Sequence, residues 1–221
     1  MKGSIAAIVT PMKSNGDVDF DSFKNLLLFH EESGTDGLVL VGTTGESATL
    51  KKEERNEIFS FCSTETTLPL MAGVGSSSTL ESIELIELAL NHNIKDCLAV
   101  TPYYNKPSQK GLELHFNALC ETEANITLYN VPGRTGVDLL PNTTSKLAEN
   151  KNITGIKEAV NTSERFMELK KVKQNRTDFI LLSGDDPTFV NFMKYEGDGI
   201  ISVAANVMPK EMKYLSDLCL N

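Results

Sequence analysis

One lysine, Lys157, lies inside a short apolar stretch, residues 152–159, that is otherwise typical of a buried strand. Burying an ammonium group without a partner is unfavourable, and a buried lysine commonly responds by releasing its proton. A neutral amine in a dry site can attack a carbonyl carbon and form a Schiff base. The structural alternative is a lysine at the end of a strand that reaches water or pairs with the neighbouring Glu158. Taken alone, Lys157 fits that alternative better, and other residues must decide.

Two further candidates for chemistry follow one another near the middle of the chain. Tyr129 ends an apolar run, and a phenol there could relay protons to and from a carbinolamine. Its structural alternative is a core tyrosine whose hydroxyl bonds to the backbone. Arg134 follows a Pro-Gly turn, which suits bidentate binding of a carboxylate, and a solvated surface arginine is the alternative.

Two glycine-containing turns could bind anions. Residues 42–46, Gly-Thr-Thr-Gly-Glu, could hold a small carboxylate through backbone N–H groups and hydroxyls, and an ordinary turn with a helix cap explains them equally well. Residues 73–78 resemble the start of a dinucleotide-binding fingerprint, but Ser78 occupies the place of its third glycine. No acidic residue follows at the required distance, so we reject the nucleotide interpretation.

The paired acids Asp185 and Asp186 invite a metal hypothesis. A helix cap before Pro187 explains Asp186 more simply, and neither an HExxH nor an EF-hand pattern is present. No serine-histidine or cysteine-histidine signature supports hydrolysis by a triad. The histidines fall in helical stretches far from the expected strand ends and are assigned no chemistry: His30, His92 and His115.

The composition describes a globular chain and excludes several classes of partner. Of 221 residues, 40% are hydrophobic and 23% are charged, and the formal net charge is -9 at pH 7. Nucleic acids and anionic membrane surfaces favour basic patches, so neither is expected as a partner. The 4 cysteines are scattered without a CxxC pair, as in reduced cytosolic proteins. With no signal-peptide pattern and no apolar run near the roughly 20 residues of a membrane span, we expect a cytoplasmic protein.

Short apolar runs alternate with amphipathic helical patterns along the whole chain. The expected strands are nearly continuous apolar runs, as in parallel strands buried on both faces, and span residues 4–9, 37–41, 70–74, 97–101, 126–130, 153–157, 179–183 and 199–203. These repeats predict an α/β fold, a (β/α)8 TIM barrel, with an open doubly wound sheet as the alternative. Catalytic groups of a barrel lie at the C-terminal ends of its strands, where the polar turns occur. Ser78 and Glu81 have the spacing of a capping box at the start of one helix.

Together these segments resemble the dihydrodipicolinate synthase family. Its members are class I aldolase-like barrels that make 4-hydroxy-tetrahydrodipicolinate from pyruvate and aspartate semialdehyde. The matching segments follow the family's order over nearly the whole chain: residues 3–11, GTTGES at 42–47, TPYYNKPSQ at 101–109, LYNVPGRTG at 128–136, GIKEA at 155–159 and LSGDD at 182–186. GIKEA alone would not be specific, whereas the combination is.

The resemblance implies a role for each catalytic candidate. Lys157 would be the Schiff-base lysine and Tyr129 the general acid/base above it. Thr43 and Tyr104 would complete a proton relay, with Tyr104 donated across a subunit interface. The imine would make a methyl group of pyruvate acidic, and the resulting enamine would attack the aldehyde. Transimination would then release a cyclic product.

The same resemblance implies the binding residues and partners. Thr44, Gly184 and the backbone at Ile201 would hold pyruvate, and Arg134 would bind the carboxylate of L-aspartate-4-semialdehyde. No metal or organic cofactor is required, and a homotetramer built as a dimer of dimers is expected. The activity belongs to lysine and diaminopimelate biosynthesis.

Two rival functions stay open at this point. The first is an N-acetylneuraminate lyase or another 2-keto acid aldolase, which would share the lysine and the tyrosine, although Arg134 and the pair Tyr103-Tyr104 favour the synthase. The second is a non-catalytic remnant that keeps the barrel for binding or assembly. It arises because family members continue into a helical C-terminal region, whereas residues 1–221 read as a single barrel domain truncated after its eighth unit. A final helix is expected over roughly residues 210–218, and we expect this chain to be less soluble and less active than an extended one.

Many family members also bind lysine as a feedback inhibitor near the residue that corresponds to Tyr103. Lys52 and Arg55 stand where some inhibited relatives carry histidines, and Ser77 where they carry asparagine. Two added cations should repel an ammonium ligand, so weak or absent inhibition is expected. The corresponding positions are Ala48, Lys52, Arg55, Ser77 and Glu81.

Overall fold

Eight parallel strands close into a barrel in the computed structural model, which describes residues 1–220. Each strand pairs with the next, and β8 pairs back onto β1. The strands are β1 Gly3–Ala7, β2 Gly37–Leu40, β3 Leu70–Gly73, β4 Asp96–Val100, β5 Asn125–Asn130, β6 Ile153–Glu158, β7 Ile180–Ser183 and β8 Gly199–Ser202. Every strand that the sequence predicts is present, with ends that differ by a residue or two. The barrel interpretation is therefore confirmed, and the open doubly wound sheet is wrong.

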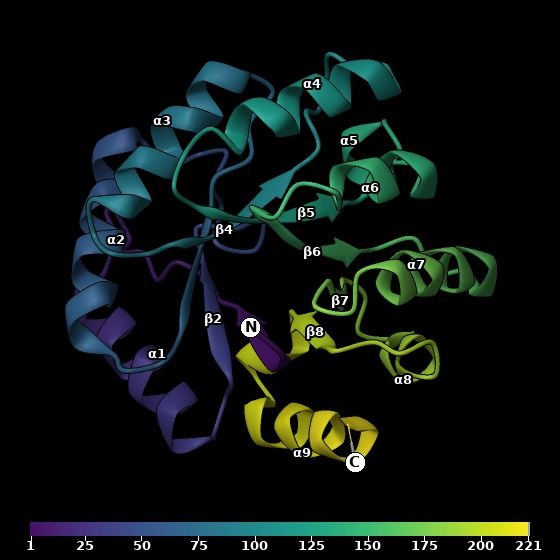
Figure 1. The fold of residues 1–221 in the computed structure, drawn as a ribbon. Coiled ribbons are helices and arrows are strands. Elements are labelled where there is room, and N and C mark those ends of the chain that lie inside the picture. Colours follow the sequence, from purple (N-terminus) through teal and green to yellow (C-terminus); the bar gives the residue numbers. More distant parts are fainter. Residues whose placement is uncertain (221) are drawn as a thin grey trace.

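Helices follow the strands and surround the barrel on its outside (Figure 1). They are α1 Phe20–Glu32, α2 Lys52–Glu65, α3 Thr79–Leu90, α4 Gln109–Leu119, α5 Pro132–Thr135, α6 Pro141–Leu147, α7 Ser163–Asn175, α8 Phe189–Met193 and α9 Pro209–Leu220, with a 3-10 turn η1 Ala204–Asn206. The expected last helix corresponds to α9. None of the described helices is long and apolar enough to cross a membrane.

Two glycines allow the first and last strands to meet. Gly3 and Gly199 are paired in register, and their φ angles are +88° and +148°. A Cβ on Gly199 would lie 2.2 Å from the carbonyl oxygen of Gly3, so no other residue fits there without moving the backbone. Closure of the barrel thus depends on backbone contact at this seam.

Strand side chains alternate between two separate cores. The barrel interior is filled by Ile5, Ala7, Val39, Met71, Leu98, Tyr129, Val131, Leu182 and Ile201. The larger core lies between the strands and the helices and includes Ala6, Leu38 and Leu40, the neighbours of those interior residues in the chain. Because Lys157 follows the outward-facing Ile156, its side chain is directed into the barrel.

Helix starts agree only partly with the local signals. Ser78 is the N-cap of α3 and accepts a hydrogen bond from the backbone of Glu81. The Glu81 carboxylate, however, accepts from the hydroxyl of Ser76, so the reciprocal half of the expected capping box is absent. The backbone N–H of Ser78, which a capping box would pair with the Glu81 carboxylate, donates instead to the Ser76 hydroxyl.

Candidate active site

The register of β5 and β6 brings two expected catalytic residues together. Tyr129 is paired directly with Lys157, and the lysine Nζ lies 4.3 Å from the centroid of the tyrosine ring. Only 5% of Lys157 and 7% of Tyr129 is exposed. A lysine amine and a phenol therefore share a dry position at the C-terminal end of neighbouring strands.

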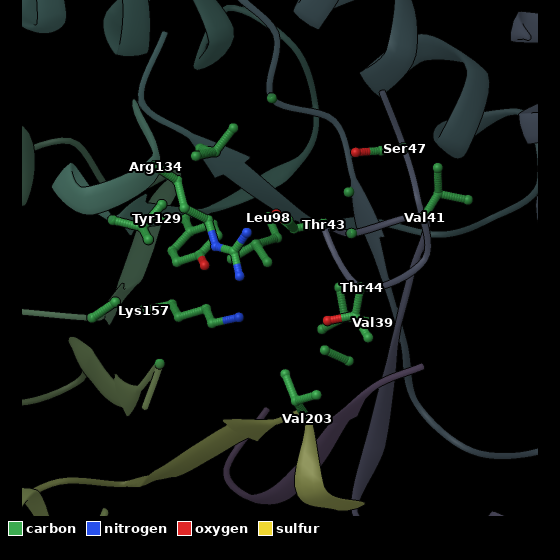
Figure 2. A pocket seen from close by; sticks show the side chains of 18 of the residues that line it. Val39, Val41, Thr43, Thr44, Ser47, Leu98, Tyr129, Arg134, Lys157 and Val203 are labelled. Carbon is green, nitrogen blue, oxygen red and sulfur yellow. The ribbon is translucent and has the colours of Figure 1, made fainter. Parts of the chain in front are cut away.

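These residues open into a cavity of about 470 Å³ at the C-terminal ends of the strands. In Figure 2 the side chains of Lys157, Tyr129 and Arg134 extend into this space, and Thr44 and Val203 lie across from them. Thr43 and Gly184 also line it. Six of the eight expected site residues thus meet in one cavity: Lys157, Tyr129, Thr43, Thr44, Arg134 and Gly184.

The surroundings of Lys157 favour the neutral amine. Burial lowers its pKa from 10.5 to about 8; the Asp186 carboxylate opposes this shift, and the Arg134 guanidinium adds to it. Glu158 does not pair with Lys157, because its side chain leaves the opposite face of β6 and binds Arg165. The structural alternative for Lys157, a strand-end lysine that reaches water or pairs with Glu158, is therefore wrong, since Lys157 is also only 5% exposed.

Tyr129 keeps its proton at neutral pH. Burial raises the pKa of its phenol, and this outweighs the lowering effect of the Arg134 cation. Tyr129 lines the cavity, beside the Lys157 amine. The protonated phenol is available to a molecule in the cavity.

Arg134 is presented by α5, the single helical turn that begins at Pro132 directly after β5. The turn ends at Gly136, whose φ of +73° is left-handed, as is usual for a helix C-cap. Among the described residues the Arg134 guanidinium makes no hydrogen bond or ion pair, although it lines the cavity. An unpaired guanidinium beside a buried amine can receive a carboxylate.

Two expected site residues are not in the lining. Ile201 is 1% exposed and packs inside the barrel, and Val203 reaches the cavity at that strand's end instead. Tyr104 is 92% exposed, has a left-handed φ of 72° and lies outside the cavity. Its role depends on a neighbouring subunit and stays a prediction.

Asp186 has a different role from the expected helix cap. Helix α8 begins at Phe189, beyond Pro187, and its N-cap residue Thr188 makes no side-chain cap bond. The Asp186 carboxylate instead accepts from the Ser202 hydroxyl at 2.5 Å and from the backbone N–H groups of Val203 and Ala204 at 3.1 and 3.2 Å. It fixes the loop after β8 and supplies a negative charge that acts on Lys157. Sequence reasoning missed this role, because its partners lie 16 to 18 positions away.

No group of three or more His, Cys, Asp or Glu side chains that could hold a metal ion occurs among residues 1–220. Burial lowers the pKa of both His30 and His115 to about 4. His30 binds the Thr35 hydroxyl and His115 that of Thr79, within the helical layer. They lie away from the cavity, as the sequence predicts.

Comparison with known proteins agrees with this architecture. The 4-hydroxy-tetrahydrodipicolinate synthase of Buchnera aphidicola subsp. Schizaphis graminum is 46% identical over 222 residues, which cover 99% of this chain and 75% of that protein. The chloride-inhibited dihydrodipicolinate synthase of Acinetobacter baumannii, solved as a complex with pyruvate, superposes with a TM-score of 0.94 at 43% identity, over 99% of this chain and 76% of that one. The enzyme of Cyanidioschyzon merolae, solved with lysine bound, gives a TM-score of 0.93 at 36% identity, over 98% and 74%.

The closed (β/α)8 barrel and its relatives place this chain among enzymes of the class I aldolase type, which are lyases. The profile of the Dihydrodipicolinate synthetase family matches residues 1–221, and the chain belongs to that family. It spans about three quarters of the length of the relatives above.

Proposed function

We propose that this protein is a 4-hydroxy-tetrahydrodipicolinate synthase, which condenses pyruvate with L-aspartate-4-semialdehyde through a Schiff base on Lys157. The observation that carries the proposal is the position of the Lys157 amine, 4.3 Å from the Tyr129 ring in a cavity that also holds Arg134. Relatives at 46% identity carry this activity in their names. The activity places the protein in lysine and diaminopimelate biosynthesis.

The first half of the reaction needs a neutral amine and a proton donor. Lys157 adds to the carbonyl carbon of pyruvate, and loss of water from the carbinolamine gives the imine. Tyr129 is protonated and lies beside the amine, so it can donate a proton to the departing hydroxyl and take one back later. The Thr44 hydroxyl and the backbone near Gly184 are the groups proposed to hold the pyruvate carboxylate.

The second half forms a carbon–carbon bond. Loss of a methyl proton converts the imine into an enamine, which attacks the aldehyde carbon of the second substrate and is restored to an imine. The amino group of that substrate then attacks the imine carbon, closes the ring and releases Lys157. Arg134 is the proposed ligand of the second carboxylate, because its guanidinium is unpaired within the described chain and faces the cavity.

Assembly and location complete the proposal. Tyr104 projects from the surface, which suits a relay residue given to a neighbouring subunit, and Thr43 would link it to Tyr129. A homotetramer built from two dimers would satisfy this arrangement. The cytoplasm, where the substrates of amino-acid biosynthesis are found, is the proposed location.

Covalent trapping tests the proposed function. Borohydride added with pyruvate should reduce the imine and leave a pyruvate-derived adduct on the peptide that contains Lys157, as read by mass spectrometry. Lys157→Arg serves as the control and should remain unlabelled. Labelling of another lysine, or of none in a folded sample, contradicts the assignment.

A coupled assay with aspartate semialdehyde then separates the synthase from its relatives. Cleavage of N-acetylneuraminate without semialdehyde turnover would favour the lyase. A folded protein that traps no pyruvate would favour a non-catalytic remnant.

A further inference from the structure

Behind the cavity, on the outer face of the same strands, lies a second cluster of polar side chains. The Glu158 carboxylate is completely buried and accepts hydrogen bonds from the side-chain amide of Asn130 at 3.0 and 3.1 Å. It also accepts from the backbone N–H of Val160 at 2.7 Å and from Arg165 at 3.1 Å. A buried carboxylate with this many donors is held in one position.

Two members of this cluster are the chain neighbours of the proposed catalytic pair. Asn130 follows Tyr129 on β5, Glu158 follows Lys157 on β6, and each pair is matched in register. Side chains alternate along a strand, so Tyr129 and Lys157 face the cavity while Asn130 and Glu158 face the helices. A bond between the outer pair therefore fixes the spacing of the inner pair.

Arg165 and Asp138 extend the cluster to the helical layer. Arg165 donates to both oxygens of Asp138, at 3.1 and 2.6 Å, and to the carbonyl of Leu139 at 3.0 Å. Asn130 donates to Asp138 at 2.8 Å and accepts from the backbone of Leu139 at 2.9 Å. Arg165 lies in the first turn of α7, where a helix disfavours a positive charge. Its ion pairs with two carboxylates explain that placement.

The cluster also reaches the third strand of the site. The backbone N–H of Gly184, directly after β7, donates to the carbonyl of Glu158 at 2.7 Å. Across β5 and β6, the N–H of Ala159 donates to the carbonyl of Asn130 at 3.0 Å. Glu158 is thus the point at which the ends of β5, β6 and β7 are joined.

We propose that Asn130, Asp138, Glu158 and Arg165, called here the strand-end clamp, are positioning residues that hold the Lys157 amine against Tyr129. The inference rests on the imine chemistry proposed for Lys157. None of the four lines the cavity, so they act through the strand ends and not on substrate. Removing one member leaves buried hydrogen-bonding groups of the others without partners, and the strand ends must then move or admit water.

Glu158→Gln is the discriminating variant, because it keeps the shape of the side chain and replaces one acceptor by an amide donor facing Arg165 and Asn130. The measurement is the rate constant of imine formation at saturating pyruvate, by rapid mixing and borohydride quench. We expect this rate constant to fall roughly 10- to 100-fold, as for a small misplacement of reacting groups. The pyruvate concentration at half saturation should change far less, because the Thr44 hydroxyl and the backbone of Gly184 keep their chemical identity in this variant.

The pH profile supplies a readout that stability alone does not change. The amine contacts the Tyr129 ring, the charges of Arg134 and Asp186 act on it, and Asp185 lines the same cavity. Burial raises the pKa of Glu158 to about 7, so near pH 8 most of this carboxylate is charged in the wild type. Losing that charge would lower the pKa of Lys157, whereas loosening the strand ends admits water and raises it. An upward shift of the profile midpoint in Glu158→Gln therefore indicates loosening. Arg165→Lys keeps the positive charge. Its pH-profile midpoint should therefore lie between those of the wild type and of Arg165→Met.

Asp198→Asn is the matched control. Asp198 is also a buried carboxylate with ion pairs, to Lys173 at 2.6 Å and Lys2 at 2.7 Å, but it precedes β8 at the opposite end of the barrel. This variant should lose stability and keep the wild-type rate constant and midpoint. If folded clamp variants keep the wild-type rate constant of imine formation and the wild-type pH midpoint, the positioning role is overturned and the proposed function is not. A wild-type protein that forms no imine would overturn the proposed function and this inference together.

Discussion

Gly184 lies against the side chain of Lys157. A Cβ built on Gly184 would come within 3.2 Å of both Cγ and Cε of the lysine and within 3.1 Å of the Glu158 carbonyl. These distances are shorter than ordinary van der Waals contact, and the carbonyl cannot retreat because it accepts the Gly184 N–H at 2.7 Å. The absence of a side chain at position 184 is therefore what gives the lysine its path to the cavity.

Gly184→Ala should accordingly impair imine formation. The added methyl group displaces the lysine chain, so the rate constant of pyruvate trapping should fall by roughly 10-fold or more. Overpacking at a closely packed site typically costs about 1–3 kcal/mol, so thermal unfolding should also move downward. A folded Gly184→Ala protein that traps pyruvate at the wild-type rate would contradict this account.

Imine formation should depend on pH through the Lys157 amine. Its pKa of about 8 leaves a minority of neutral amine at pH 7 and mostly neutral amine above pH 8. The trapping rate at low pyruvate should rise about tenfold per pH unit below pH 8 and level off above it. A profile that keeps rising toward pH 10 would mean that the lysine has an ordinary pKa.

Lys157→Met should stabilise the fold. Burial lowers the lysine pKa from 10.5 to about 8, which costs about 3 to 4 kcal/mol at about 1.4 kcal/mol per unit. Between these values the folded state binds fewer protons than the unfolded state. The stability advantage of the variant should thus be full below pH 8 and shrink as the pH approaches 10.5. Denaturant unfolding at several pH values measures it, and an equal advantage at every pH would refute the burial cost.

Arg134→Ala should separate the two substrates. Trapping of pyruvate should be largely preserved, while turnover of aspartate semialdehyde should lose about 1.5–3 kcal/mol of transition-state binding, the typical worth of a charged hydrogen bond. Arg134→Lys keeps the charge without the bidentate geometry. Its turnover of aspartate semialdehyde should lie between those of the wild type and of Arg134→Ala. Equal loss in both assays would show that Arg134 does not discriminate between the substrates.

Lysine should inhibit the enzyme weakly or not at all. Lys52 forms an ion pair with Glu84 at 2.7 Å, and Arg55 donates to the carbonyl of Ser47. Glu81, the one acid among the five positions that correspond to the lysine site, already accepts the Ser76 hydroxyl. Cations at positions 52 and 55 and an occupied carboxylate disfavour a second ammonium group. A lysine titration of the activity tests this, and strong inhibition at low lysine concentration would prove it wrong.

Much of the fold was predictable from local pattern. Parallel strands buried on both faces must be continuously apolar, so their number and approximate ends could be identified from the apolar runs along the sequence. Lys157 was recognisable for the same reason, because a single charge inside such a run is conspicuous. The polar turns after each strand predicted the end of the barrel at which Tyr129, Arg134 and Thr44 meet.

Tertiary structure decided whatever depends on pairs far apart in the chain. Closure of the barrel rests on Gly3 meeting Gly199, and the use of Asp186 rests on Ser202, a residue of the next strand. Glu158 looked like a partner for Lys157, yet alternation along β6 turns it to the opposite face, toward Arg165. Local pattern determines whether a residue is buried, whereas the partner of a buried charge is determined by packing between distant elements, and only the folded chain contains that information.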